Sequence, residues 1–461
     1  MAFASRNSSH RGSINNTDFL AQDPFRTPTR AQSVRASTIL SGRASFIASC
    51  IQRPPPKQRR FKSSRLIGDY DKPWLEKRDP RISYDRWIFY FMALVGSAIG
   101  AYICWDGWNS YGSRDFCLIW EDNFSNGIDP ASWNYEIQRG GFGSGAFDWT
   151  TNDPRNVYSD GEGLHIVPTL TVDDIGISEG ELLDGYKLNL TTDGTCTGTT
   201  IEACGITSNK TTGEIINPIR SARLNTKGKH TLQYGKVEIV AKLPKGDWLW
   251  PALWMMPEEE FYGTWPASGE IDIMESRGNE GTNYKGGRNE VGGTLHWGPT
   301  AELDMFRQTS GKRELRRTDY SEAFHTFGVE WSSDYIFIYV DSVLVQTIYT
   351  SFRKRDGTLY QRGRFGNMEI NETVPENPWA KSPNANAPFD RPFYLILNVA
   401  VGTTNGYFLD GYGRKPWRDG AEDAQRQFWY ARPVWEPTWG QGDSRGMTVK
   451  NIKMWKPGKC T

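Results

Sequence analysis

Several features that identify other classes of protein are missing from this 461-residue sequence. It has no internal repeat, no glycine-rich phosphate-binding loop and no long amphipathic helix. Its six cysteines include no C-x-x-C pair and its five histidines no H-x-x-x-H spacing, so neither a metal site nor a cofactor is expected. There is also no Ser/His/Asp array, and the acidic C-terminal region lacks the basic stripe of a nucleic-acid-binding protein.

The net charge of the whole chain is zero, but the charge is distributed unevenly along it. Residues 1–86 contain 17 Lys and Arg against 7 Asp and Glu, whereas the chain from Cys117 onward contains 36 basic and 45 acidic residues. The first segment is rich in Ser, Arg, Pro and Asn and poor in apolar residues, which is typical of disorder. We therefore predict a disordered basic cytoplasmic tail over 1–86, either simply solvated or bound to anionic lipid.

One segment lacks charge altogether. Residues 87–105, WIFYFMALVGSAIGAYICW, contain no charged residue. A helix of this length spans roughly 30 Å, about the thickness of a bilayer core. Trp87, Tyr90, Tyr102 and Trp105 lie towards its ends, where amphipathic rings favour the membrane interface. The segment therefore predicts a transmembrane helix, with a buried core helix as the alternative.

Basic residues before this segment predict its orientation. Lys77, Arg78, Arg81 and Arg86 precede it, so the positive-inside rule keeps the N-terminus in the cytoplasm. Residues 106–116 would form a juxtamembrane linker, and the region beyond would be extracellular or lumenal. We predict a single-pass type II membrane protein of the plasma membrane and cell wall or of the Golgi. The anchor is short for a plasma membrane but adequate with its aromatic belts, so a Golgi or other secretory location stays open.

The positions of the cysteines agree with this topology. Four of the six follow the predicted helix, where an oxidising compartment permits disulfides. Spacing favours a Cys196–Cys204 bridge within one loop and a Cys117–Cys460 bridge between the ends of the region, although four cysteines allow three pairings. Sequons that would be glycosylated in that compartment lie at Asn123, Asn189, Asn209 and Asn371.

Short β-rich runs recur downstream of Cys117, separated by clusters of Gly, Pro, Asn and Asp. The clearest are residues 236–243, 326–331, 335–349, 393–401 and 447–455, and DSV at 341–343 is predicted to be a hairpin turn. Many strands with few helices indicate an antiparallel sandwich or barrel. We therefore expect one all-β domain over residues 117–461. The chain also has 19 tryptophans, and indole rings that are not in the core can stack on sugars in a carbohydrate cleft.

Three acids lie close together in SGEIDIMES, residues 268–276. In a regular strand, alternation places Glu270 and Asp272 on one face and Glu275 on the other. One extra residue in a β-bulge would return Glu275 to the face of the other two, and bulges are enriched beside active sites. We therefore predict a bulge near Ile273–Met274.

Three carboxyls on one face are costly, because like charges close together disfavour joint ionisation. A retaining glycosidase uses such an arrangement, since it needs two carboxyls about 5–5.5 Å apart. We predict Glu270 as the nucleophile and Glu275 as the general acid/base. Asp272 would hydrogen-bond Glu270 and modulate its protonation. The alternative is an ordinary half-exposed strand with acidic side chains facing outward.

SGEIDIMES resembles the catalytic signature of glycoside hydrolase family 16, in the bulged form of laminarinase-like endo-β-1,3-glucanases. The resemblance includes residues 120–124, 221–257, 294–299, 324–342 and 392–402, and covers essentially all of 117–461. It implies a concanavalin-A-like β-jelly-roll sandwich with the sugar in a groove across its concave sheet. Together with the predicted anchor, it indicates a membrane-anchored member of fungal type.

The resemblance also implies a set of substrate-binding residues: Arg223, Trp250, Trp254, His296 and Trp297. Trp250 and Trp297 are expected to stack on sugar rings. For Trp254 two positions stay open, one in the cleft and one partly in the core. Arg223 and His296 are expected to donate hydrogen bonds to sugar hydroxyls or to the catalytic carboxylates. The alternative for Arg223 is an ordinary charged residue on the surface, and the alternative for His296 is a histidine with a purely structural role. Some family members carry a calcium ion, but no ligand set is evident, so no metal is assigned.

Three functions remain compatible with these residues. The first is an endo-acting hydrolase of β-1,3- or mixed β-1,3/1,4-glucan, and the second is a transglycosylase that remodels cell-wall glucan through the same residues. The third is a β-glucan-binding protein without catalysis, against which the presence of Glu270, Asp272 and Glu275 argues. The expected partners are a polysaccharide and a membrane, the latter through one helix, and the catalytic domain is expected to be monomeric.

Overall fold

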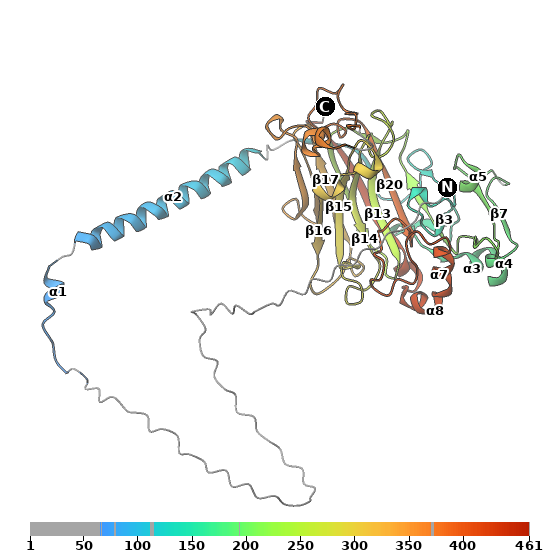
Figure 1. Cartoon of the computed structure of the whole chain (residues 1–461), viewed down its shortest axis with the longest axis horizontal. Coiled ribbons are helices and arrows are strands. Elements are labelled where there is room, and N and C mark those ends of the chain that lie inside the picture. The colour runs from blue at the N-terminus through green and yellow to red at the C-terminus, as the bar shows by residue number, and fades with distance from the viewer. Residues whose placement is uncertain are drawn as a thin grey trace, which may run out of the picture. The chain divides into compact units, whose positions relative to one another are not determined.

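The computed structural model describes residues 65, 67–77, 80–110, 115–192, 194–369 and 373–460 (Figure 1). Residues 1–64 of the predicted tail and the sequon at Asn371 lie outside these ranges. The chain divides into two units, Met1–Gly96 and Ser97–Thr461.

An apolar helix covers the predicted transmembrane segment. It is α2 (Pro80–Ser110), and it follows the short α1 (Pro73–Glu76). The stretch Ser83–Gly107 is long and apolar enough to cross a membrane. The helix extends beyond residues 87–105 at both ends and includes 106–110 of the predicted linker, because its boundaries depend on backbone hydrogen bonds and not on where the charges lie. Membrane crossing itself stays a prediction.

The region after α2 is an all-β sandwich of two antiparallel sheets, as expected. Sheet A runs in the order β19 (Gln346–Ser351), β18 (Tyr335–Val340), β17 (His325–Trp331), β12 (Gly235–Lys242), β21 (Met447–Pro457), β5 (Gly163–Ile166), β4 (Val157–Asp160), and β1 (Phe116–Asp122) also pairs with β21. Sheet B runs in the order β16 (Ser310–Glu314), β15 (Glu290–His296), β14 (Glu270–Ser276), β13 (Leu249–Pro257), β20 (Phe393–Val401), β10 (Arg223–Asn225), β2 (Asn134–Tyr135), and β11 (Thr231–Leu232) also pairs with β20.

Smaller elements decorate the sandwich. One small sheet has the order β3 (Asp148–Thr150), β9 (Ile219–Ser221), β6 (Thr169–Leu170), and a hairpin joins β7 (Lys187–Asn189) to β8 (Gly205–Thr207). The α-helices are α3 (Thr171–Ile175), α4 (Glu179–Leu183), α5 (Ile201–Cys204), α6 (Leu359–Arg362), α7 (Ala424–Tyr430) and α8 (Arg432–Trp435). The 3₁₀ turns are η1 (Gly141–Gly143), η2 (Ala301–Leu303), η3 (Phe306–Gln308), η4 (Lys354–Asp356), η5 (Phe365–Asn367), η6 (Glu436–Thr438) and η7 (Gly442–Arg445).

The predicted β-rich runs all form strands, and their alternation builds the core. Along β12, buried Val237, Ile239 and Ala241 alternate with partly exposed neighbours, so one face of the strand points into the sandwich. Side chains from sheet B, such as Leu253 and Leu295, are fully buried in the same core. The turn predicted at 341–343 lies between β18 and β19, as expected.

Both predicted disulfides are present. Cys117 lies on β1 and Cys460 follows β21, and the antiparallel pairing of these two strands brings the ends of the domain together. Cys196 and Cys204 close a short loop in the long insertion between β6 and β9. The sequons at Asn123, Asn189 and Asn209 are at least partly exposed, and their glycosylation stays a prediction.

Candidate active site

The predicted bulge lies in β14, at Ile273 and Met274. Against β15, Asp272 pairs with Thr294 and Glu275 with Gly292, so two residues of β14 oppose the single Gly293. The pairing with β13 shifts at the same place, where Leu253 faces Met274 and Trp254 faces Asp272. Ile273 and Met274 are both buried. The extra residue therefore restores Glu275 to the face that carries the other two acids, as predicted.

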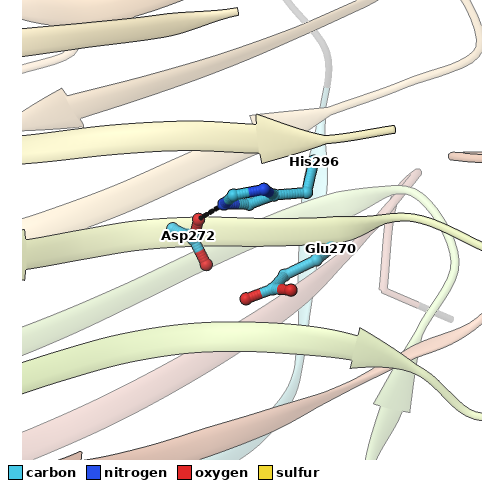
Figure 2. A group of neighbouring side chains, drawn as sticks. All are labelled: Glu270, Asp272 and His296. Carbon is cyan, nitrogen blue, oxygen red and sulfur yellow. Dashed lines mark ion pairs between the residues drawn. The ribbon is translucent and has the colours of Figure 1, made fainter. Parts of the chain in front are cut away.

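The middle acid of the cluster is the most deeply buried. Asp272 is 2% exposed, and its Oδ2 lies 3.1 Å from Nε2 of His296. Figure 2 shows this ion pair, with the Glu270 carboxylate beside it. Burial, together with the neighbouring Glu270 and Glu275 carboxylates, raises the pKa of Asp272 well above its usual range.

His296 lies between two carboxyl groups. Its Nε2 pairs with Asp272, and its Nδ1 lies 2.5 Å from Oδ2 of Asp304. Burial alone would lower the pKa of His296, but the interactions with Asp272 and Asp304 outweigh it and raise the pKa to about 12. The ring is therefore an imidazolium at neutral pH, and Asp304 remains its partner even when Asp272 is protonated.

Indole groups hold the two outer acids. Nε1 of Trp265 donates to Oε2 of Glu270 at 2.5 Å, and Nε1 of Trp250 donates to Oε1 of Glu275 at 2.9 Å. The Trp250 ring stacks on Tyr407, with centroids 4.0 Å apart. Burial raises the pKa of Glu275, and Glu270 raises it further, while His296 and the Trp250 N–H oppose the shift. Glu275 is thereby suited to hold a proton until a reacting group takes it.

The face of sheet B that carries the acids continues from β14 across β13 and β20 to β10. Trp254 is half-buried, and its Nε1 donates to Oδ1 of Asn398 at 2.7 Å. The Arg223 guanidinium lies over the Trp254 ring at 4.7 Å and over Phe142 at 3.9 Å. Arg223 forms an ion pair with Glu136, and its hydrogen bond to a sugar hydroxyl stays a prediction. Trp254 is partly exposed on the face of sheet B that carries the acids, so it is not a core residue.

Trp297 was predicted to stack on a sugar, and this prediction is wrong. Its side chain is 1% exposed, and its Nε1 donates to Oγ1 of Thr309 inside the domain. His296 ends β15 on the face that carries the acids, so the next residue points to the opposite side and packs with Phe365 and Trp379. Trp297 is a core residue.

A metal ion is a chemical alternative for the acid cluster. One ligand atom each from Glu270, Asp272 and His296 all lie within 4.8 Å of one another. Both ring nitrogens of His296 already have a carboxylate partner, Asp272 for Nε2 and Asp304 for Nδ1, so a metal ion on the ring would have to replace one of these ion pairs. No metal is assigned to the cluster.

Four residues of the site were not predicted from the sequence: Trp265, Asp304, Tyr407 and Arg277. Trp265 precedes the acidic strand closely enough for the SGEIDIMES context to have suggested it. Tyr407 and Asp304 lie in irregular segments, where no strand periodicity indicates which way a side chain points. Arg277 follows the strand and donates through Nη2 to the Tyr407 carbonyl at 2.7 Å, so it supports the stack beneath Glu275.

Comparison with known proteins matches residues 185–387 to the family of glycosyl hydrolases family 16. A β-1,3-glucan-binding protein of Penaeus monodon is 41% identical, over 74% of this chain and 90% of its own. A glucan endo-1,3-β-glucosidase of Cryptopygus antarcticus is 31% identical, over 64% of this chain and 82% of its own. The structure of an endo-β-1,3-glucanase from Pyrococcus furiosus matches with a TM-score of 0.47 and 22% sequence identity. The match covers 76% of this chain and 97% of that chain.

The chain therefore belongs to glycosyl hydrolases family 16. The chain is similar both to a glucanase and to a glucan-binding protein.

Proposed function

We propose that this chain is a retaining endo-β-glucanase that cleaves β-1,3- or mixed β-1,3/1,4-glucan, with Glu270 as nucleophile and Glu275 as acid/base. The observation that carries the proposal is the bulge at Ile273–Met274, which gathers both glutamates and Asp272 on one face. A protein that only bound glucan would gain nothing from placing three mutually repelling carboxyls side by side.

The reaction would proceed in two displacements. Glu270 attacks the anomeric carbon while Glu275 gives its proton to the departing glycosidic oxygen, which leaves a glycosyl ester on Glu270. Glu275, now a carboxylate, then takes a proton from water as the water oxygen attacks the anomeric carbon and releases Glu270. The raised pKa of Glu275 favours the protonated form that the first step requires.

Asp272 and His296 would tune this cycle. Asp272 lies between the two glutamates, and its raised pKa allows it to hold a proton against the charge of Glu270. The imidazolium of His296 offsets part of the negative charge of the cluster. Together they would allow Glu270 to change between carboxylate and ester without leaving a second uncompensated charge in the site.

Turnover of defined glucans by the full-length chain in detergent tests the proposal. New reducing ends from laminarin or mixed-linkage glucan, with retained anomeric configuration by NMR, support it. Glu270→Gln should abolish turnover but retain binding, whereas Glu314→Gln on the neighbouring β16 should leave turnover intact. Undiminished turnover by Glu270→Gln would refute the nucleophile assignment. Longer products with a constant number of reducing ends would indicate transglycosylation instead.

The relative from Penaeus monodon supports one other candidate, a β-1,3-glucan-binding protein without catalysis. Binding of laminarin by the unaltered chain, with neither new reducing ends nor transfer products, would establish that alternative. The same measurement therefore decides between the two functions.

We also propose that α2 anchors the chain in a membrane with the glucan-binding domain extracellular or lumenal. Support comes from the apolar stretch Ser83–Gly107 and from the basic residues that precede it. In sealed vesicles or intact cells, protease added on the side of the sandwich domain should spare an N-terminal tag. Loss of the tag would reverse the orientation.

A further inference from the structure

A second hollow lies outside the acid cluster, where three segments distant in sequence meet. It has a volume of about 510 Å³ and is lined by parts of 138–147, of 199–203 and of 421–425, together with Asn217 and Thr404. The second segment belongs to the insertion and is closed on itself by the Cys196–Cys204 disulfide. Figure 1 shows the insertion, with β7 and α5, at the end of the domain that also carries β3 and α7.

The lining of this pocket combines apolar side chains such as Phe142 and Phe147 with uncharged polar ones and with the acids Glu202 and Glu422. Gln138, Thr199 and Thr404 line it, and no hydrogen bond within the described part of the chain uses their side chains. Arg139, the basic residue of the lining, already donates through Nε to Asn217 and through Nη1 to the Glu202 carbonyl. Unused amide and hydroxyl groups favour a neutral, hydroxyl-rich ligand over an anion.

The pocket is connected to the acid cluster through a row of side chains. Trp254 on β13 pairs with Asp272 on β14, the Arg223 guanidinium lies 4.7 Å from the Trp254 ring, and the same guanidinium lies 3.9 Å from the Phe142 ring. Phe142 itself lines the pocket. A polymer that leaves the acids along Trp254 and Arg223 therefore arrives at the pocket.

The loop that holds Phe142 is fixed in an unusual conformation. Gly141, Phe142 and Gly143 have φ angles of 65°, 51° and 84°, all in the left-handed region. A bulky aromatic residue rarely adopts this region, and it persists only where its surroundings determine it. Packing against Arg223 supplies such surroundings, so the ring is held between groove and pocket.

We propose that this pocket is a glucosyl-binding subsite formed in part by the disulfide-closed insertion, and that it receives one sugar residue of a glucan bound along Trp254 and Arg223. The proposal rests on the proposed function in assuming that a β-glucan occupies the acid groove. The sugar comes either from the end of a long linear chain or from a β-1,6-linked branch, since both present the same neutral glucopyranose ring.

Binding as a function of ligand length and branching tests this subsite. Full-length Glu270→Gln protein in detergent is titrated calorimetrically with the linear series from laminaribiose to laminariheptaose, and with a β-1,6-branched laminarin. Thr199→Trp, which fills the pocket, and Gln138→Ala, which removes its free amide, are each added to this background. Thr207→Trp is the matched control, because Thr207 is exposed on β8 of the same insertion and does not line the pocket.

Filling the pocket should weaken binding of the longest linear ligand by about tenfold, the equivalent of one or two lost hydrogen bonds, and leave laminaribiose unaffected. Gln138→Ala should act in the same direction and Thr207→Trp should have no effect. A loss confined to branched laminarin would assign the subsite to a branch. Equal affinities of Thr199→Trp and its background for every ligand would overturn the subsite.

Hydrolysis by the chain with intact Glu270 is measured separately. If the chain with intact Glu270 hydrolyses glucan and Thr199→Trp changes no binding affinity, the subsite alone is refuted. Weakened binding by Thr199→Trp in a chain that never turns over glucan would retain the subsite and refute the hydrolase.

Discussion

A histidine held between two carboxylates behaves differently from one with a single partner. Nε2 of His296 forms an ion pair with Asp272 and Nδ1 forms one with Asp304, and both ion pairs require the doubly protonated, positively charged ring. Burial works against that charge, but the two carboxyls outweigh it and raise the pKa of His296 to about 12. A fixed positive charge therefore lies beside the three acids over the whole physiological pH range.

Replacing Asp304 tests this arrangement. Asp304→Asn keeps an Oδ1 acceptor for the backbone N–H groups of Trp297 and Phe306 but loses the negative charge beside His296. The pKa of His296 should fall, and turnover should drop about tenfold, the equivalent of one weakened charge-assisted bond. The measurement is the pH profile of kcat, in which a new loss should appear on the alkaline side. An unchanged profile in a variant with unchanged Tm would contradict this role.

The hydrogen bond from Trp250 predicts a second pH effect. Its N–H favours the ionised form of Glu275, so Trp250→Phe should raise the pKa of Glu275 further. A general acid acts while it is protonated, so activity is lost as pH rises through its pKa. The alkaline limb of kcat should therefore move upward by roughly one pH unit, the size of one charge-assisted hydrogen bond. A downward shift would show that Glu275 is not the group that limits activity there.

At the scale of elements, the bulge depends on the strand beside it. Gly293 on β15 is the single residue opposite Ile273 and Met274, and a Cβ at that position would lie 2.9 Å from both Ile338 Cγ2 and Thr347 Oγ1. Those atoms belong to β18 and β19 of sheet A. The absence of a side chain at Gly293 therefore allows the two sheets to approach beneath the bulge.

Gly293→Ala should force the sheets apart at this point. We expect a loss of about 1–3 kcal/mol in the free energy of unfolding, as for other overpacked core positions, together with lower kcat because β14 would move. The neighbouring Gly292→Ala is the control, because a Cβ there has no neighbour closer than 3.8 Å. Urea unfolding and turnover of both variants check the prediction; equal behaviour of the two would refute it.

The same elements show why part of the site could be predicted from the sequence. Strand alternation and the requirement for two facing carboxyls together indicated the bulge, because a regular strand would have separated Glu275 from Glu270. Trp297 was misplaced because resemblance assigned it to a motif without saying which face it occupies. Asp304 and Tyr407 lie outside regular strands, where contacts depend on how the chain folds back and no periodicity reports them.

At the scale of the whole molecule, the ends of the sandwich domain are joined twice. β1 pairs with β21, and Cys117 is bonded to Cys460 across a sequence separation of 343 residues. The second disulfide, Cys196–Cys204, spans only 8 residues. In the chain-entropy account, the longer loop restricts the unfolded state far more.

Removing each disulfide by paired Cys→Ser substitutions should therefore have unequal effects. Loss of the Cys117–Cys460 bond should cost on the order of 5 kcal/mol and loss of the Cys196–Cys204 bond about half as much. Denaturant unfolding of the two double variants measures this difference. A larger loss for the short loop would mean that packing of the insertion, and not chain entropy, dominates its stability.

The bulge also has a consequence for how such sequences evolve and are compared. Deleting one codon at Ile273 or Met274 would leave Glu270, Asp272 and Glu275 all in the gene, yet Glu275 would turn away from the other two acids. A catalyst could thus become a lectin in a single genetic event without losing an acid. The presence of all three acids in a relative is then a poor test of activity. The number of residues between the acids is a better test, because it shows whether the bulge is there.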